Sequence, residues 1–357
     1  MTAVLSGFAA RVLRWQSSEG RNDLPWNQGR DPYRVWLSEI MLQQTQVVTV
    51  IAYFERFIAR FPDVQALAQA PLDDVMALWA GLGYYSRARN LHRCAGQVVQ
   101  QHGGRFPDNA KALQALPGIG RSTAAAIAAF CFGERVAILD GNVKRVLTRV
   151  LGFERDLSVA AHEKELWSLA ESLLPGADLQ ATMPRYTQGL MDLGATVCTP
   201  RAPVCDACPV RTVCVARRDG TPLKFPVRSR KLRRSSESLW LLQAQSGNGE
   251  IWLHRRAQTG IWAGLHCLPV FSSREALAQA VPPQHRAALE DAPTVTHVLT
   301  HKDLFLHPVE VILPGMPPLG DGSWCSSDQQ EKLGLPAPVR KLIDRACSRP
   351  VPGGESM

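Results

Sequence analysis

Four cysteines within a 17-residue segment are the side chains of this sequence with the clearest chemical use. They are Cys198, Cys205, Cys208 and Cys214. Thiolates are soft ligands, and four at this spacing can bind one Zn²⁺ ion or one iron–sulfur cluster. Prolines between residues 199 and 209 interrupt helix and strand, so ligation would have to order the loop. The other five cysteines are scattered singly, which disfavours the alternative of four unrelated thiols.

A carboxylate stands where a strand-like run gives way to a helix. Asp140 follows the apolar residues 137–139 and precedes a helical pattern that begins at Gly141. The simplest interpretation is a helix N-cap, in which the side chain accepts hydrogen bonds from the first amides. Such donors also favour the ionised form of the carboxyl group. Asp140 could therefore cap the helix and also stabilise a developing sugar cation.

A glutamate lies on an otherwise apolar helical segment. Glu39, Gln43 and Gln46 recur at i, i+4 and i+7, and Trp36 and Ile40 flank them. Apolar neighbours raise the pKa of a glutamate, so that it can carry a proton at neutral pH. The alternative is an exposed glutamate in an ordinary ion pair. The row of amides favours a functional surface that reads bases or fills the place of a displaced one.

A tight turn separates two expected helices at 107–115 and 121–131. Its sequence, residues 116–120, includes Gly118 and Gly120, which allow positive φ and close approach of the backbone to a partner. Amides at the start of the second helix can bind an anion. The turn is therefore a candidate clamp for DNA phosphate, although an ordinary helix–helix turn would have the same pattern.

The composition describes a folded protein with a concentrated positive charge. The 357 residues are 45% hydrophobic and carry a net charge of +8. Residues 217–234 contain eight Lys and Arg against one Asp, so they hold nearly all of this excess. Proline and glycine in this stretch indicate a basic linker, which suits contact with a phosphate backbone or a solvated hinge. No apolar run reaches the roughly 20 residues of a membrane span, and the cysteine content favours a reducing compartment.

Two domains are expected, because the chain is too long for one ordinary domain. Residues 1–216 are helical by pattern, and 217–235 form the linker. Residues 236–346 alternate expected strands (239–243, 251–254, 295–300 and 304–313) with expected helices (273–281 and 337–346). The fold class is thus an all-α domain followed by a smaller α/β domain, and residues 347–357 are expected to be a flexible tail.

Together these segments resemble the helix–hairpin–helix DNA glycosylases with a 4Fe–4S loop, and among them the adenine DNA glycosylase (MutY) family. The resemblance covers nearly the whole chain. It includes Leu24–Trp26, Trp36–Val47, Gly81–His92, the turn at 116–120, Leu139–Val146 and the cysteine loop. It implies that the four cysteines bind one 4Fe–4S cluster rather than zinc.

The resemblance also implies roles in catalysis. Glu39 corresponds to the general acid that protonates adenine, and Asp140 to the carboxylate that stabilises the sugar cation before water completes hydrolysis. Asn142 corresponds to a residue that supports Asp140 and the attacking water. Two carboxyl groups with opposed protonation states are typical of glycoside hydrolysis. The base must first leave the stack, at a cost of about a few kcal/mol.

Further positions are expected to contact DNA or the base. Trp26 and Leu42 correspond to the adenine pocket. Gln43, Gln44 and Tyr84 correspond to residues that wedge into the duplex beside the opposing 8-oxoguanine. The turn contributes its own set of expected DNA contacts: Gly118, Gly120 and Ser122.

Ser122 also separates two subfamilies. Relatives resembling endonuclease III carry there a lysine that forms a Schiff base and cuts the strand. A serine cannot form an imine, so we expect a monofunctional enzyme that leaves an abasic site. A bifunctional glycosylase/lyase is the nearest alternative.

The C-terminal domain resembles the Nudix-like domain that this family uses to recognise 8-oxoguanine, and residues 260–265 match best. The glutamate-rich metal-binding helix of a Nudix hydrolase is not evident in the sequence, so pyrophosphatase activity is not expected. Thr300 and His301 stand where the family has its recognition loop. We expect a monomer that binds double-stranded DNA with A:8-oxoguanine or A:G mispairs, in a bacterial-type cytoplasm near the nucleoid. A DNA-binding scaffold without catalysis and a Nudix nucleotide hydrolase are the remaining alternatives.

Overall fold

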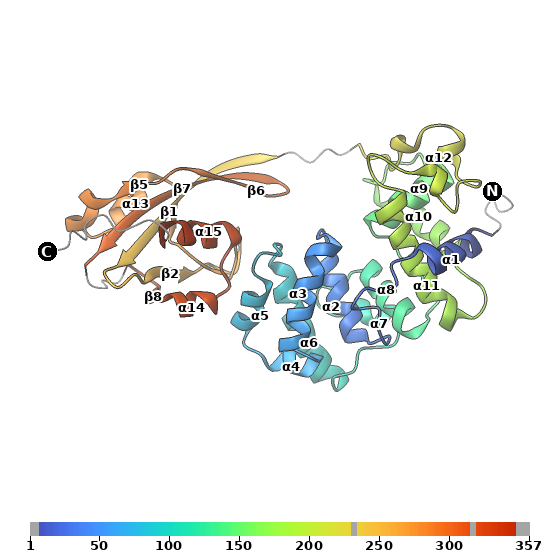
Figure 1. Ribbon diagram of the computed structural model, residues 1–357, viewed down its shortest axis with the longest axis horizontal. Coiled ribbons are helices and arrows are strands. Elements are labelled where there is room, and N and C mark those ends of the chain that lie inside the picture. The colour runs from blue at the N-terminus through green and yellow to red at the C-terminus, as the bar shows by residue number, and fades with distance from the viewer. Residues whose placement is uncertain (1–6, 230–233, 315–318, 348–357) are drawn as a thin grey trace. The chain divides into compact units, whose positions relative to one another are not determined.

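The computed structural model describes residues 7–229, 234–314 and 319–347 (Figure 1). The chain forms two compact units. The first contains residues 1–69 and 93–231, and the second contains residues 70–92 and 232–357. The segment 70–92, which the sequence analysis assigned to the helical domain, therefore groups with the C-terminal unit.

The first unit is helical throughout its described part. Its elements in chain order are α1 (Phe8–Glu19), α2 (Pro32–Leu42), α3 (Val47–Arg60), α4 (Val64–Gln69), α7 (Ala110–Gln114), α8 (Arg121–Phe132), α9 (Gly141–Leu151), α10 (Ala160–Ser172), α11 (Leu179–Asp192), the π-helix η1 (Leu193–Val197), the 3₁₀ turn η2 (Cys205–Ala207), α12 (Val215–Arg218) and the 3₁₀ turn η3 (Pro222–Lys224). Helix α6 (Ser86–His102) begins in the second unit and continues into the first. None of the helices in the described ranges has both the length and the apolar character that a membrane crossing requires.

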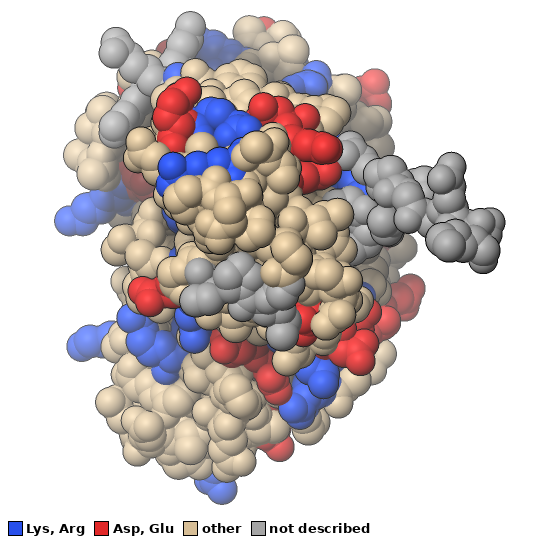
Figure 2. All heavy atoms as spheres, turned by 90° about the vertical axis from the view of Figure 1, so that its left-hand side faces the viewer, with Lys and Arg blue, Asp and Glu red and all other residues tan. Residues whose placement is uncertain are grey.

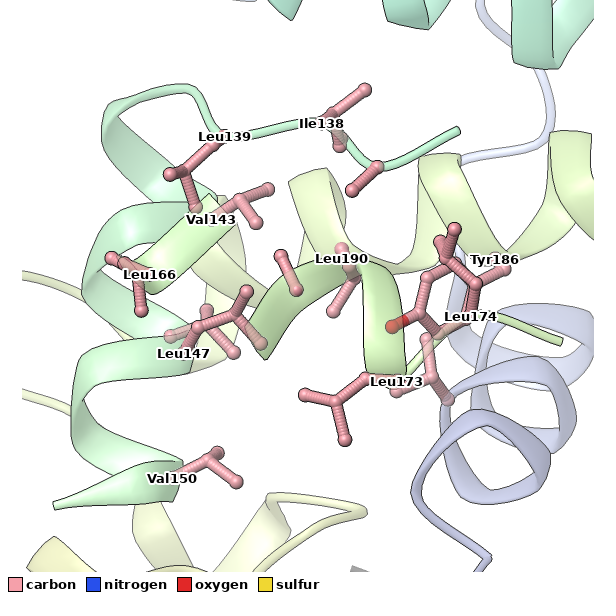
Figure 3. Close-up of a cluster of buried hydrophobic side chains, with 14 of the residues drawn as sticks. Ile138, Leu139, Val143, Leu147, Val150, Leu166, Leu173, Leu174, Tyr186 and Leu190 are labelled. Carbon is pink, nitrogen blue, oxygen red and sulfur yellow. The ribbon is translucent and has the colours of Figure 1, made fainter. Parts of the chain in front are cut away.

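The core of this unit fixes the helix that follows Asp140. Val143, Leu147 and Val150 recur at i, i+4 and i+7 on α9 and are buried against α10 and α11 (Figure 3). Ile138 and Leu139, in the strand-like run before the helix, are buried in the same cluster. Apolar contacts therefore hold the backbone on both sides of Asp140.

The second unit contains a mixed sheet of eight strands in the described residues. They are β1 (Ser235–Ser246), β2 (Ile251–Arg255), β3 (His266–Cys267), β4 (Val270–Phe271), β5 (Glu290–Asp291), β6 (Val295–Val298), β7 (Lys302–Leu313) and β8 (Ser323–Cys325). Helices α5 (Leu72–Trp79), α13 (Arg274–Ala280), α14 (Ser327–Glu331) and α15 (Ala337–Cys347) and the 3₁₀ turn η4 (Pro283–Ala288) complete the unit (Figure 1).

The centre of this sheet is a long parallel pair. β1 and β7 pair from Ser235–Lys302 to Ser246–Leu313, while β2 runs antiparallel to β1 and β6 antiparallel to β7. The β6–β7 hairpin turns through residues 299–301, where the Leu299 amide donates to the Lys302 carbonyl. The candidate recognition residues Thr300 and His301 thus lie on a tight turn.

One expectation is corrected by the structure, and two others concern residues that lie partly outside the described ranges. Helix α2 ends at Leu42, and Gln46 is the N-cap of α3. The expected polar strip of Glu39, Gln43 and Gln46 on one helix is therefore wrong, because the backbone turns between Leu42 and Val47. Of the expected tail at 347–357 only Cys347 is described, and residues 230–233 of the linker also lie outside the described ranges.

Candidate functional site

Glu39 lines a pocket inside the helical unit. Helix α2 is started by Asp31, whose side chain accepts from the Tyr33 amide at 2.9 Å, and by Pro32 in its first turn. The opposite face of α2 is buried in the core, so Glu39 is turned toward the pocket. The unfilled volume there is about 40 Å³. Because one water molecule needs roughly 10–15 Å³, a few waters fit there.

The surroundings of Glu39 favour the protonated form of its carboxyl group at neutral pH. Although the residue as a whole is only half-buried, its carboxyl group is surrounded by protein, and this desolvation raises the pKa of Glu39 to about 8. The negative charge of Asp140 is the second cause. The sequence-based expectation of a raised glutamate pKa is thereby confirmed, and the burial of the carboxyl group is its main reason.

Asp140 caps α9 and lies within electrostatic range of Glu39. Its Oδ1 accepts from the Val143 amide at 2.7 Å, and the Asn142 amide also donates to the carboxylate. Burial nevertheless raises the pKa of Asp140, and the amides and the positive charges of Arg145 and Lys144 offset only part of this effect. The expected effect of the cap is confirmed, because both amides lower the pKa, but burial outweighs it.

The surroundings of the two carboxyl groups still favour different protonation states. Four groups act to keep Asp140 ionised, whereas both causes acting on Glu39 favour its neutral form. In a coupled pair the group with stabilised charge loses its proton first. The arrangement therefore favours a neutral Glu39 beside an ionised Asp140.

The hairpin turn is held by buried apolar side chains, and its glycines are exposed. Leu116 and Ile119 are buried, while Gly118 and Gly120 are exposed. Gly118 has φ 76°, as expected. Gly120 has extended backbone (φ −82°), so positive φ is not its reason for being glycine. A Cβ on Gly120 would meet no atom within 4 Å, which leaves this face open to a partner.

Ser122 connects the hairpin to the catalytic segment. Its Oγ accepts from the Leu139 amide at 3.1 Å. Ser122 thus holds the backbone directly before Asp140, which the sequence did not reveal.

The four cysteines of the loop line one cavity. Cys198 follows the π-helix η1, Cys205 and Cys208 bound η2, and Cys214 precedes α12. Leu193, Val197 and Val210 form the apolar lining. Burial raises the pKa of Cys208 to about 12, and the other three sulfurs contribute to this through their charge, so all four lie within mutual range.

A buried arginine holds the first cysteine. Arg149 is 2% exposed, and its guanidinium donates to the Cys198 Sγ at 3.2 Å and to the Thr199 carbonyl at 2.8 Å. Its Nε is buried without a partner among the described atoms. A cation against a sulfur suits a negatively charged thiolate cluster, so the residues present fit such a group. Within the described residues, however, no group of three or more His, Cys, Asp or Glu side chains is arranged to hold a single metal ion.

Helix α9 joins the two chemical sites. Arg145 donates to the Asn142 Oδ1 at 2.9 Å, to the Gly194 carbonyl at 2.6 Å and to the Cys198 carbonyl at 2.7 Å. A Cβ on Gly194 would come within 2.6 Å of the Asn142 Cβ, so only glycine permits this packing. The helix capped by Asp140 is therefore fastened directly to the cysteine loop.

The expected base pocket and wedge residues are placed as follows. Trp26 and Leu42 line the Glu39 pocket, and Trp26 packs edge-to-face on Phe54 at 5.4 Å. Gln43 and Gln44 form the turn after α2, and Gln44 adopts φ 59°. Positive φ in a residue other than glycine is strained and is common at functional sites.

In the C-terminal unit, Tyr84 is 44% exposed and adopts φ 47°. Its hydroxyl is hydrogen-bonded to the Thr300 Oγ1, and His301 lies exposed beside Thr300. These side chains and Trp262 border a cleft of about 670 Å³. Lys and Arg lie among Asp and Glu on the face seen in Figure 2, so the positive charge forms no continuous patch on that face.

Sequence reasoning missed the polar wall of the Glu39 pocket. Arg21, Asn27 and Gln188 line it together with Phe130. No spacing or motif relates these residues to Glu39. Arg145 and Arg149 were also missed, although their i, i+4 spacing on an amphipathic helix is a detectable signal.

Comparisons with known proteins agree with this fold. Residues 37–172 match the family described as HhH-GPD superfamily base excision DNA repair protein, and residues 240–345 match the NUDIX domain. A thermostable thymine-DNA glycosylase structure shares 30% identity, with a TM-score of 0.54 over 61% of this chain and 98% of that one. An endonuclease III–DNA complex has a TM-score of 0.51 at 18% identity over 62% of this chain and 98% of that one, which shows a common fold. Fold and site thus define a DNA glycosylase of base excision repair.

Curated relatives narrow the class. Adenine DNA glycosylase from Buchnera aphidicola subsp. Acyrthosiphon pisum is 35% identical over 94% of this chain and 97% of that protein. Adenine DNA glycosylase from Homo sapiens is 46% identical over 60% of this chain and 40% of that protein. The chain belongs to the adenine DNA glycosylase family, and the expected fold class, an all-α glycosylase domain followed by a Nudix-like domain, is confirmed.

Proposed function

We propose that this glycosylase hydrolyses the N-glycosidic bond of adenine paired with 8-oxoguanine or guanine in double-stranded DNA. The observation that carries the proposal is a Glu39 carboxyl group whose burial favours its protonated form, within electrostatic range of Asp140. Intact adenine is a poor leaving group, so an acid that keeps its proton near pH 7 is the first requirement. The family membership supports adenine as the base.

The two carboxyl groups then have different tasks. Glu39 donates its proton to a ring nitrogen of adenine, which makes the base a better leaving group. As the bond to the sugar breaks, positive charge develops on the sugar, and the ionised Asp140 stabilises it. Asn142, whose side chain is held by Arg145, supports Asp140 and the water that completes hydrolysis.

The base is proposed to enter the pocket that Trp26 and Leu42 line. Energy for unstacking the base comes from contacts with the DNA backbone. The exposed glycines of the hairpin are placed to make such contacts through main-chain amides.

The cysteine loop is proposed to hold one 4Fe–4S cluster through Cys198, Cys205, Cys208 and Cys214. Such a cluster supplies ligation energy that orders the loop. Arg149 donates to the Cys198 sulfur. Arg145, on the helix that Asp140 caps, donates to the Cys198 carbonyl and so connects the loop to that helix.

Recognition of the opposite base is assigned to two places. Gln44, with Gln43 beside it, is proposed to wedge into the duplex, and its strained backbone supports that role. In the C-terminal unit, Tyr84, Thr300 and His301 gather at the cleft, which supports contact with 8-oxoguanine. The domain is proposed to read the lesion without hydrolysing nucleotides. We expect a monomer acting on chromosomal DNA in a bacterial-type cytoplasm.

The experiment uses purified protein and a duplex with one adenine opposite 8-oxoguanine, incubated and then divided between neutral and hot alkaline treatment. Nicks only after alkali are expected, because Ser122 cannot form the imine that precedes strand cleavage. Nicks without alkali would show a glycosylase/lyase instead. A duplex with thymine opposite 8-oxoguanine is the control, and cleavage of both duplexes alike would contradict the proposed specificity.

A further inference from the structure

A fully buried carboxylate lies behind the polar wall of the pocket. Asp192 is the last residue of α11, and its side chain is only 1% exposed. Its Oδ2 accepts from the Arg21 amide at 2.9 Å, and its Oδ1 accepts from the Arg21 Nε at 2.7 Å and from the Gln188 Nε2 at 2.8 Å. Both donors line the pocket of Glu39. We infer that Asp192 is a positioning residue that holds Arg21 and Gln188 beside the base and neutralises Arg21 there.

The first reason is the nature of the segment that Asp192 holds. Residues 20–31 connect α1 to α2 without regular secondary structure, so backbone pairing does not fix them. Yet this segment supplies four members of the pocket wall: Arg21, Leu24, Trp26 and Asn27. Asp192 holds this segment through hydrogen bonds from both the main chain and the side chain of Arg21. The Asn27 side chain donates to the Arg21 carbonyl at 3.3 Å, so the position of Asn27 depends on that of Arg21.

The second reason is charge. A guanidinium in the wall would favour the ionised form of Glu39, and that would remove the proton needed for catalysis. The Asp192 carboxylate in direct contact compensates this charge. The other charged or titratable groups near Glu39 are Asp140 from the start of α9 and Cys131 from α8. Lys144 and Arg145 act on Asp140, and Arg30 and Asp31 act on Cys131.

The inference rests on the proposed function, since it concerns the proton of the same acid. It adds a residue with no proposed contact to the base, and it predicts a distinct effect on the pH dependence. A side chain that only stabilised the fold would change the amount of active protein equally at all pH values. A side chain that sets the charge of the wall would move the alkaline limit of activity.

The test compares Asp192→Asn with the wild type, with Asp178→Asn as the matched control. Asp178 is exposed at the other end of the same helix. Single-turnover adenine release from an A:8-oxoguanine duplex is measured between pH 6 and 9, with circular dichroism and iron content as checks of the fold. For Asp192→Asn we expect a rate at least about tenfold lower at pH 8 and an alkaline limit roughly one pH unit lower. Asp178→Asn should match the wild type.

A double substitution, Arg21→Met with Asp192→Asn, separates the effect of the unpaired Arg21 charge from the loss of the hydrogen bonds that position the pocket wall. It leaves no unpaired cation, so it should fold even where Asp192→Asn gives little protein. Its rate should remain at least about tenfold low, while its alkaline limit returns to the wild-type position. A folded Asp192→Asn protein with wild-type rate and pH profile would overturn the inference, and so would a double variant with wild-type rate. Absence of adenine release from the wild type would instead refute the proposed function.

Discussion

The charge on Asp140 raises the pKa of Glu39, so two carboxyl groups from distant parts of the sequence lie within electrostatic range of each other. Glu39 comes from helix α2, and Asp140 comes from the capped start of α9. Each group alone has an ordinary explanation, as a partly buried glutamate or as an N-cap. Their proximity makes the pair chemically useful, because a proton donor and an anion can then act on the same bond.

Replacing Glu39 by glutamine should abolish catalysis and leave DNA binding intact. Glutamine has nearly the same shape but no proton to give, so we expect adenine release to fall by about 10²–10⁴-fold. Binding is measured by fluorescence anisotropy on the mispaired duplex, and chemistry by single-turnover release. Glu55→Gln, on the exposed face of α3, is the matched control. Equal loss of binding and turnover in Glu39→Gln would point to a structural role, and an undiminished rate would remove Glu39 from the mechanism.

The pH dependence follows from the same group. Glu39 has a pKa of about 8 in the folded protein, against an ordinary value of 4.5. Below pH 4.5 both folded and unfolded chains carry the proton. Between pH 4.5 and 8 the unfolded chain has lost it and the folded chain has not, so the free energy of unfolding decreases as pH rises, by about 1.4 kcal/mol per unit at most. Activity should decline above about pH 8, as the acid loses its proton.

The measurement compares denaturant unfolding of the wild type and Glu39→Gln from pH 4 to pH 9. The two proteins should be similarly stable near pH 4, and the variant should gain a relative advantage up to about pH 8. A difference that is constant across this range would show that the carboxyl group does not titrate as the burial of Glu39 requires.

Local signals in the sequence predicted much of this fold. The N-cap role of Asp140, the hairpin at 116–120 and the hydrophobic stripe of α9 were all readable, because each depends on neighbours within one or two turns. The break after Leu42 was not. Glutamine is a good helix former, so periodicity alone carried the helix past its true end.

Long-range features could not be predicted in the same way. The parallel pairing of β1 with β7 joins segments separated by five other strands and two helical elements, and neither strand encodes its partner's register. Likewise Gln188 reaches the Glu39 pocket through the packing of α11. The motif resemblance supplied the chemistry, and only the folded chain showed which polar groups surround it.

Substitutions at Asp140 should separate capping from catalysis. Asparagine caps a helix about as well as aspartate, so Asp140→Asn should keep the bond from the Val143 amide and unfold at nearly the wild-type denaturant concentration. Asp140→Ala should lose about 1 kcal/mol through the missing cap. Both should lose adenine release by about 10²-fold or more, since neither carries a negative charge. An active Asp140→Asn protein would show that the residue serves only as a cap.

Loss of one cysteine ligand should disorder the loop and thereby reach the active site. Cys208→Ser is expected to lower the iron content and the visible absorbance of the purified protein, because oxygen is a poorer ligand for a soft cluster. The segment 198–214 has little regular structure of its own, so it should become sensitive to protease. Cys325→Ser, in the C-terminal unit, is the control and should keep its iron. Because Arg145 links the Cys198 carbonyl to Asn142, adenine release should fall together with the iron content. An iron-depleted Cys208→Ser protein with an intact loop and full activity would show that the cysteines neither order this segment nor support the start of α9.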